Sequence, residues 1–362
     1  MHKQGLTSLA LQKFKKSFWG VFSFWFIVFM AFISVFAYIL APDSSQYANQ
    51  MHLSIHSKAP GFSVPILVVP SSLNEEQNFF NRLFFGDSNP ATEIPVSSHR
   101  FEPTNIYYTT YASDGLKGLE KSIEFPLVSP ISSRPFITQR TFYFGTDKYG
   151  RDLLSRILVG ARISFSIGFI AVFISLLIGV FLGSIAGYFG GKWDALIMWV
   201  INVTWSIPTL LLVIAITLAL GKGFWQVFIA VGLTMWVEVA RIVRGQVMSV
   251  KKMQYVTAAR ALGFTDYRII VKHILPNILA PVIVISAANF AAAILIESGL
   301  SFLGIGAQPP VSSWGAMIKD HYNYIILGKP YLALIPGLCI MSLVMAFMLI
   351  GNTLRDALDV KA

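Results

Sequence analysis

The chain has 362 residues, of which 55% are hydrophobic, 14% aromatic and only 13% charged. A soluble protein carries roughly 25% charged residues, so this composition excludes an ordinary water-soluble protein and indicates one embedded in lipid. The net charge of +10 does not indicate nucleic-acid binding, because the basic residues are scattered between long apolar runs. The single cysteine, Cys339, excludes an intrachain disulfide.

Six apolar stretches are long enough to cross a bilayer, which takes about 20 helical residues for a hydrocarbon core of about 30 Å. They run approximately Phe18 to Leu40, Ile163 to Tyr188, Ala195 to Leu220, Phe224 to Ala240, Asn277 to Ser298 and Tyr331 to Leu354. The first follows several lysines, as a secretory signal does, but it has no small-x-small cleavage site and we predict a retained anchor. The sequence therefore predicts an all-α membrane protein with six transmembrane helices.

Lysines and arginines of short loops predict the orientation, because they gather on the cytoplasmic side. The N-terminal tail, residues 1–17, carries four lysines, and Arg355 and Lys361 lie at the other end of the chain. The segment after the fourth stretch is equally basic, with Arg241, Arg244, Lys251, Lys252, Arg260, Arg268 and Lys272. With six spans these segments all fall inside, so we expect both termini in the cytoplasm and residues 41–140 outside it.

Residues 41–140, which follow the first span at 18–40, have the character of a soluble domain. Prolines separate short apolar runs such as Phe62 to Val69 and Ile106 to Tyr111, which predict strands. Ser72 and Glu75 form a capping box before a predicted helix. We expect a small extracytoplasmic α+β domain inserted before a five-helix core at residues 141–362. His52 and His56 would share a strand face, but two histidines alone favour ordinary side chains over a metal site.

Small residues and prolines predict how the spans pack. Gly179, Gly183, Gly187 and Gly191 follow at four-residue spacing, so one face of the second span lacks side chains and we expect a neighbouring helix to approach it closely. Pro208 removes a backbone hydrogen bond and predicts a kink near Ser206.

No catalytic constellation is evident in the sequence, and we expect neither enzyme activity nor a cofactor in this chain. The nearest approach to a phosphate-binding loop is Gly190-Gly191-Lys192, which Trp193 follows in place of the serine or threonine of such loops. Glu238 and Glu297 lie at the ends of apolar runs, where we expect capping or interhelical contacts rather than proton relay.

The predicted cytoplasmic loop at residues 251–276 contains signals for two short helices. Tyr255 to Leu262 is a helical run that Gly263 can end, and Thr265 with Asp266 can cap a second helix running to His273. Pro276 then opens the fifth span, where its missing N–H costs nothing. We expect an elbow of two helices below the membrane.

This loop resembles the coupling loop of ABC importer permeases, a pattern of Glu-Ala-Ala, three residues, Gly, nine residues and Ile-x-Leu-Pro. Ala258, Ala259, Gly263, Leu275 and Pro276 match it. Thr257 replaces the glutamate and His273 stands at the isoleucine position. The resemblance implies contact with an ATPase through the loop residues Tyr255, Thr257, Ala258, Ala259, Arg260, Gly263, Leu275 and Pro276.

Two further stretches are similar to the C-type permease subunit of dipeptide and oligopeptide (and nickel) importers. The first, before the second span, contains Gly145, Thr146, Asp147, Gly150, Arg151, Asp152, Ser155 and Arg156. The second, after the fifth span, contains Glu297, Ser301, Phe302, Leu303, Gly304, Gly306, Gln308, Pro309, Pro310, Trp314 and Gly315. Independently of kinship, Asp147 with Arg151 and Asp152 with Arg156 have i,i+4 spacing and predict an interfacial helix before the second span.

The resemblance covers roughly Phe144 to Val360. It implies half of the pore of an ATP-driven importer in the bacterial inner membrane, with a homologous permease subunit, two ATPases that bind ATP and magnesium, and an extracytoplasmic substrate-binding protein as partners. The 41–140 insertion departs from the family pattern; it would dock the binding protein, cover the pore or hold the heterodimer together. Cargo stays open between peptides and nickel or another small solute. An ion-coupled secondary transporter is the rival class, with Asn202, Thr204 and Ser206 as its polar cluster.

Overall fold

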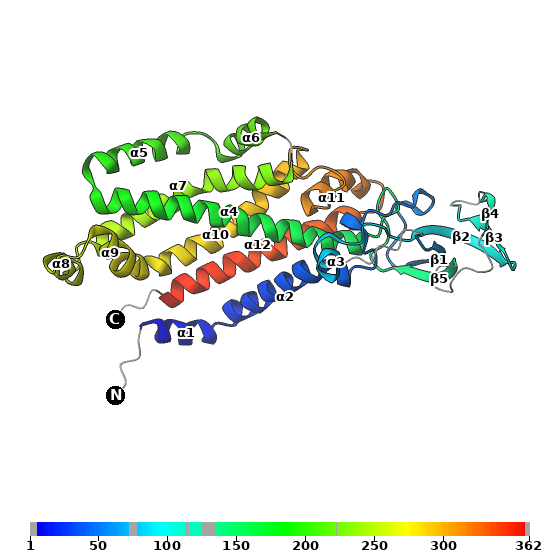
Figure 1. Ribbon diagram of the computed structural model, residues 1–362, viewed down its shortest axis with the longest axis horizontal. Helices are drawn as coiled ribbons and strands as arrows, with labels where there is room; N and C mark the ends of the chain where they lie inside the picture. The colour runs from blue at the N-terminus through cyan, green and yellow to red at the C-terminus, as the bar shows by residue number, and fades with distance from the viewer. Residues whose placement is uncertain are drawn as a thin grey trace. The chain divides into compact units, whose positions relative to one another are not determined.

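Long apolar helices make up most of the computed structural model, which describes residues 6–71, 78–112, 116, 118–124, 135–221 and 223–358. The helices are α1 (Leu6–Lys16), α2 (Phe18–Leu40), α3 (Phe79–Phe85), α4 (Leu153–Phe189), α5 (Gly191–Trp205), α6 (Thr209–Leu220), α7 (Phe224–Val250), α8 (Gln254–Ala261), α9 (Asp266–Ile269), α10 (Leu275–Phe302), α11 (Trp314–His321) and α12 (Tyr331–Leu358). Figure 1 shows the long helices and the strands.

The chain divides into two compact units. The helical unit comprises Met1–Ala31, Ser164–Gln308 and Leu338–Ala362, and the mixed unit comprises Phe32–Ile163 and Pro309–Gly337. The mixed unit therefore contains more than the predicted insertion, because it includes the start of α4 and all of α11.

Among the described residues, five helices are long and apolar enough to cross a membrane, and the count reaches six if the bent pair α5 and α6 forms one span. Where a kink was predicted, these two helices meet at 93°. Pro208 lacks an N–H and disfavours helical geometry in Ile207 before it, so α5 ends at Trp205 and α6 starts at Thr209. The predicted single third span is thus two helices with a break.

Glycines let α4 and α7 approach closely, as the four-residue spacing predicted. A Cβ added to Gly179 would lie 2.5 Å from Val239 Cβ, and one added to Gly183 would lie 2.5 Å from the backbone oxygen of Ala240. At Gly187 the same atom would be 2.7 Å from the oxygen of Arg244. Figure 1 shows the two helices side by side. Gly191 does not belong to this stripe; it starts α5 in open space with φ of +53°.

The mixed unit contains an antiparallel sheet of five strands in the order β4-β3-β2-β1-β5. Its strands are β1 (Phe62–Val69), β2 (Thr92–Phe101), β3 (Asn105–Thr110), β4 (Glu120–Glu124) and β5 (Phe136–Phe142). Successive residues of β1 face opposite sides, so Ile66 is buried in one apolar cluster and Leu67 in another. The sheet supports the predicted α+β character, and β1 has the predicted bounds.

The capping box at Ser72 and Glu75 lies outside the described residues, and α3 begins after Asn78, whose side chain accepts from the N–H of Phe80. His52 and His56 are not on a strand; they flank a 3₁₀ turn at Leu53–Ile55.

The prediction of a separate interfacial helix before the second span was wrong. Asp147 and Arg151 lie in turns, and a single helix, α4, runs from Leu153 onward. It starts there because Asp152 accepts a hydrogen bond from the Ser155 N–H at 2.9 Å, as an N-cap residue does. Burial raises the pKa of Asp152, which the hydrogen bonds from Ser155 oppose.

The glycine stripe generates a stability prediction. Gly183→Ala forces a Cβ against the backbone of α7 and should lower the free energy of unfolding by about 1–3 kcal/mol, the usual cost of overpacking. Gly245→Ala is the matched control on α7, because nothing lies within 4 Å of an added Cβ there. Thermal unfolding of the purified detergent-solubilised protein measures both. Equal melting temperatures for the two variants would refute the close approach.

Candidate functional site

The projecting elbow of the helical unit is built from α8, α9 and a π-helical turn at Ile270–Ile274 that leads into α10. Gly263 ends α8 with φ of +79°, which favours glycine. Its N–H donates to Arg260 O at 3.0 Å, and that of Phe264 donates to Ala259 O at 3.2 Å. This is the Schellman arrangement that satisfies the last carbonyls of a helix. Figure 1 shows α8 and α9 at one end of the long helices.

The second half of the elbow begins where the sequence predicted, but it does not end there. Thr265 caps α9, since its hydroxyl accepts from the Arg268 N–H at 3.4 Å. The helix does not stop at His273 as expected, because the π-helical turn continues it into α10 with Pro276 in the first turn. π-helical turns are often found at functional sites.

Buried side chains fix the elbow to α4 and α7. Val256, Ala259 and Ile269 are buried in one cluster with Val243 and Val247 of α7. Burial of a side chain such as valine or isoleucine contributes about 1.5–3 kcal/mol in water. The elbow is therefore packed against the long helices and is not a loose loop.

Tyr188, near the end of α4, joins the elbow by hydrogen bonds. Its hydroxyl donates to Asp266 Oδ1 at 2.5 Å and accepts from Arg260 Nη2 at 3.2 Å. Lys251 Nζ donates to the backbone oxygen of Tyr188. The Tyr188 side chain thus connects α4 to α8 and α9, and its backbone oxygen connects α4 to the end of α7. Arg260 is engaged here, while the guanidinium of Arg268 lies 4.2 Å from the centre of the Phe264 ring.

The outward face of the elbow exposes large apolar and aromatic side chains among charged ones. Tyr255, Leu262 and Tyr267 are 43%, 74% and 77% exposed. Thr257 and Ala258 are exposed beside them, whereas Ala259 faces inward. Large apolar side chains grouped on a projecting element indicate a protein contact.

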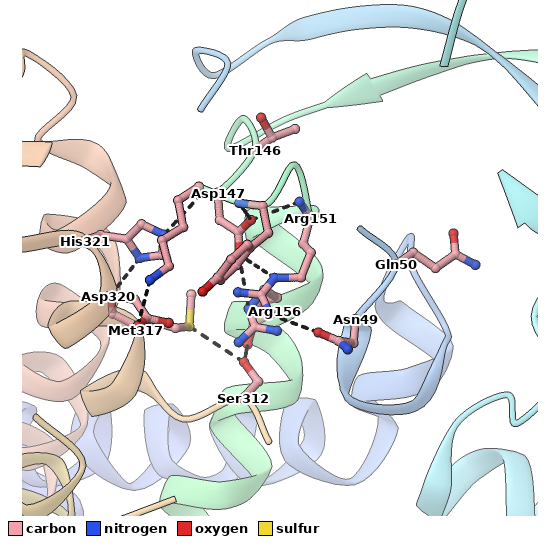
Figure 2. Close-up of polar contacts among 12 residues, drawn as sticks. Asn49, Gln50, Thr146, Asp147, Arg151, Arg156, Ser312, Met317, Asp320 and His321 are labelled. Atoms are coloured by element: carbon pink, nitrogen blue, oxygen red, sulfur yellow. Dashed lines mark hydrogen bonds and ion pairs between the residues drawn. The ribbon is translucent and has the colours of Figure 1, made fainter. Parts of the chain in front are cut away.

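The first signature stretch forms a second polar site in the mixed unit, which we call the Asp147 cluster. Asp147 is fully buried; its Oδ1 accepts from the N–H groups of Tyr149 and Arg151 at 2.8 and 3.0 Å. Its Oδ2 accepts from Arg151 Nε at 2.6 Å, and Arg156 Nε lies 3.7 Å away. Figure 2 shows both guanidinium groups converging on this carboxylate. Arg156 thus pairs with Asp147, not with Asp152 as its spacing predicted.

The glycines of this stretch allow close backbone approach. Gly145 and Gly150 have φ of +77° and +75°. A Cβ at Gly150 would lie 1.8 Å from the backbone oxygen of His52, and one at Gly145 would lie 2.3 Å from that of Lys58. Thr146 is buried and donates to Ile55 O at 2.5 Å. The stretch therefore packs residues 52–58, which precede the sheet, against the segment that leads into α4.

Helix α11 completes the Asp147 cluster. Trp314 is fully buried and its Nε1 donates to Ile157 O at 3.0 Å, while Gly160 leaves room for its ring. His321 Nδ1 is 2.7 Å from Met317 O, and its Nε2 is 3.4 Å from the N–H of Lys148. A neutral ring with Nδ1–H donating and Nε2 accepting fits both contacts, and burial lowers the pKa of His321 accordingly.

Lys148 and Asp320 form the more accessible edge of the same cluster, with Nζ and Oδ1 3.0 Å apart. Burial opposes the charge of Lys148, but the hydrogen bond and charge of Asp320 outweigh it and raise the lysine pKa. Asn49 Oδ1 accepts from Arg151 Nη1 at 2.9 Å.

The second signature stretch folds back on the end of α10. Ser301 donates to Glu297 Oε1 at 2.6 Å and accepts from the Ala307 N–H at 3.1 Å. Gln308 donates to the oxygens of Gly304 and Gly306. This contact of Glu297 lies within its own helix and is neither the capping nor the interhelical contact that was expected. Phe302 and Leu303 are exposed, and Gly315 is buried with Trp314 in α11.

Sequence reasoning missed Tyr188, Asn49, Asp320 and His321. Their side chains make functional-site contacts with residues far away in the chain, so no short motif contains them. The signal available was charge: Asp320 and His321 follow the second signature within otherwise weakly charged sequence. The polar cluster of the third stretch gives little support to an ion-coupled secondary transporter. Thr204 and Ser206 donate their hydroxyl hydrogen bonds to nearby carbonyls of the same segment.

The long apolar helices define a multi-pass membrane protein. The chain matches the family model "binding-protein-dependent transport system inner membrane component" over residues 179–361 and "N-terminal TM domain of oligopeptide transport permease C" over residues 5–60. It therefore belongs to the family of binding-protein-dependent transport system inner membrane components, and it is a pore subunit rather than an enzyme.

Curated relatives agree with this family. The dipeptide transport system permease protein DppC of Bacillus subtilis is 41% identical over 65% of this chain and 76% of its own length. DppC of Alkalihalophilus pseudofirmus is 43% identical, and the glutathione transport system permease protein GsiD of Escherichia coli is 42% identical, each over 60% of this chain and 72% of its own length. Among solved structures, a chain of the MetNI methionine ABC transporter aligns over 56% of this chain and 95% of its own length, with 17% identity and a TM-score of 0.47.

Proposed function

We propose that the chain is a permease subunit of an ATP-driven importer of di- and oligopeptides, in which it forms half of the pore. The names of the DppC and GsiD relatives support a peptide cargo. Two cytoplasmic ATPases, a homologous permease subunit and an extracytoplasmic binding protein complete the assembly. In this proposal α5 and α6 count as one broken span, which gives six spans with both termini in the cytoplasm.

The observation that carries the proposal is the elbow, whose inward side is packed and whose outward side exposes large apolar and aromatic side chains. Its outward face, Tyr255, Leu262 and Tyr267, is the surface that the ATPase would contact. Its inward face is fixed to α4 and α7 by the buried cluster and by Tyr188. Displacement of the elbow by the ATPase would therefore move the long helices with it. Small displacements become large rearrangements because packed interfaces switch between discrete arrangements.

The coupling role predicts a specific effect of changing Gly263. Gly263→Pro removes the N–H that caps α8 and imposes φ of about −65° where the turn needs a positive angle. ATP-driven uptake of a labelled dipeptide into proteoliposomes holding the whole complex should fall by about tenfold or more, a barrier change of about 1.4 kcal/mol.

Gly263→Asn is the matched control, because asparagine tolerates the left-handed conformation and keeps its N–H. It should transport at close to the normal rate, and both variants should insert at normal levels. Normal uptake by Gly263→Pro would show that coupling does not pass through this turn.

The orientation predicts which surfaces an impermeant reagent reaches. In a Cys339→Ala background, Ser88→Cys should react with an impermeant maleimide added outside intact cells whose outer membrane has been permeabilised. Leu262→Cys in the elbow should react only after the inner membrane is opened, although both positions are exposed in the chain. The opposite labelling pattern would reverse the topology and remove the elbow from the ATPase side.

A further inference from the structure

Arg156 is a buried cation whose guanidinium is satisfied only in part by the protein. Its side chain is only 4% exposed. Nε and Nη1 have no hydrogen-bond partner among the described residues, although Nε is 3.7 Å from the Asp147 carboxylate. A guanidinium carries five N–H donors, and a buried one is normally satisfied by an acceptor.

Every nearby carboxylate is already engaged. Asp147 accepts the close hydrogen bonds from Arg151, and Asp320 accepts from Lys148. Asp43, also buried near Arg156, accepts from the N–H groups of Ser45 and Gln50 at 2.9 and 3.2 Å. Arg151 adds a bond to Asn49 (Figure 2). Arg156 thus has the 3.7 Å ion pair with Asp147, but its Nε and Nη1 have no hydrogen-bond acceptor in the described part of the chain.

Arg156 also lines a cavity of about 310 Å³ in the mixed unit, together with Arg151, Asp320, Tyr149, Pro310 and Ala316. This volume lies at the lower end of the range for small-molecule sites. The lining combines apolar and aromatic side chains with the two guanidinium groups. A planar fork of this kind matches the two oxygens of a carboxylate.

We propose that this cavity binds the free carboxylate of a small peptide, with Arg156 as its ligand. The proposal rests on the proposed peptide cargo and adds a recognition site for it on this chain. The other possible source of a carboxylate is an acidic side chain of a docking protein. The cavity favours the small ligand, because the guanidinium is enclosed and the volume exceeds that of a single side-chain carboxylate.

Calorimetric titration of the purified whole complex in nanodiscs, without binding protein, tests the site with the dipeptide Ala-Ala and its C-terminal amide. Ala-Ala should bind, and the amide should bind about tenfold or more weakly, because it lacks the charged acceptor. Arg156→Gln should weaken Ala-Ala binding to the same extent. Arg100→Gln, which removes an exposed arginine of the same unit, should leave it unchanged.

Ala316→Phe keeps every charge and fills the cavity, so it should also abolish binding even if Arg156→Gln fails to fold. Equal binding of Ala-Ala and its amide, no binding of Ala-Ala to the unaltered complex, or normal binding to the Ala316→Phe protein would overturn the proposal. Dipeptide uptake by the complete system is measured in parallel. Uptake without binding in the cavity would refute this site alone, whereas absence of any peptide uptake would refute the cargo as well.

Discussion

The close approach of α4 to α7 is the constraint on which the helical unit depends. Gly179, Gly183 and Gly187 place the backbone of α4 directly against α7, at distances that no side chain would permit. In lipid such contacts replace the hydrophobic driving force that helices have in water. The stripe ends one residue before Tyr188, so the same approach positions the tyrosine that holds the elbow.

Tyr188 connects the long helix α4 to the elbow. Its hydroxyl is shared by Arg260 and Asp266, and its ring is buried with Val247 and Ile269. Hydrogen bonds that involve a charged group contribute about 1.5–3 kcal/mol each, more than neutral ones. With the Schellman turn at Gly263, these contacts make the elbow a continuation of α4 and α7. In the proposed mechanism the three elements therefore move as one body.

Much of the fold was predictable because a helix that crosses lipid needs a run of about 20 mostly apolar residues. The positions of the long helices, the bounds of β1 and the capping by Thr265 and Gly263 all follow from local sequence. The break at Pro208 was predicted, but its 93° angle was not, because proline says where a helix stops and not where the next one points. The prediction of an interfacial helix was wrong because it relied on i,i+4 spacing alone. In the structure the Asp147 carboxylate accepts from the N–H groups of Tyr149 and Arg151 and closes a turn.

The two candidate sites differ in how far sequence alone could reach. The elbow is contiguous, so its motif contained most of the residues that build it. The Asp147 cluster draws Asn49, Arg156 and Asp320 from distant segments, and only the folded chain brings them together. Its signature residues were found by resemblance. Their hydrogen bonds could not be predicted, and neither could the two Arg156 donors, Nε and Nη1, that have no acceptor among the described residues.

Spin-label distances across the elbow test the central claim most directly. Leu262→Cys and Phe181→Cys, on the elbow and on α4, are exposed positions that can carry labels in a Cys339→Ala background. Double electron–electron resonance is recorded on the reconstituted complex without nucleotide and after trapping with ATP and vanadate. The account predicts one distance distribution that stays the same in both states while transport remains coupled. A shift or broadening of that distribution on trapping would show that the elbow moves independently of α4, and would contradict it.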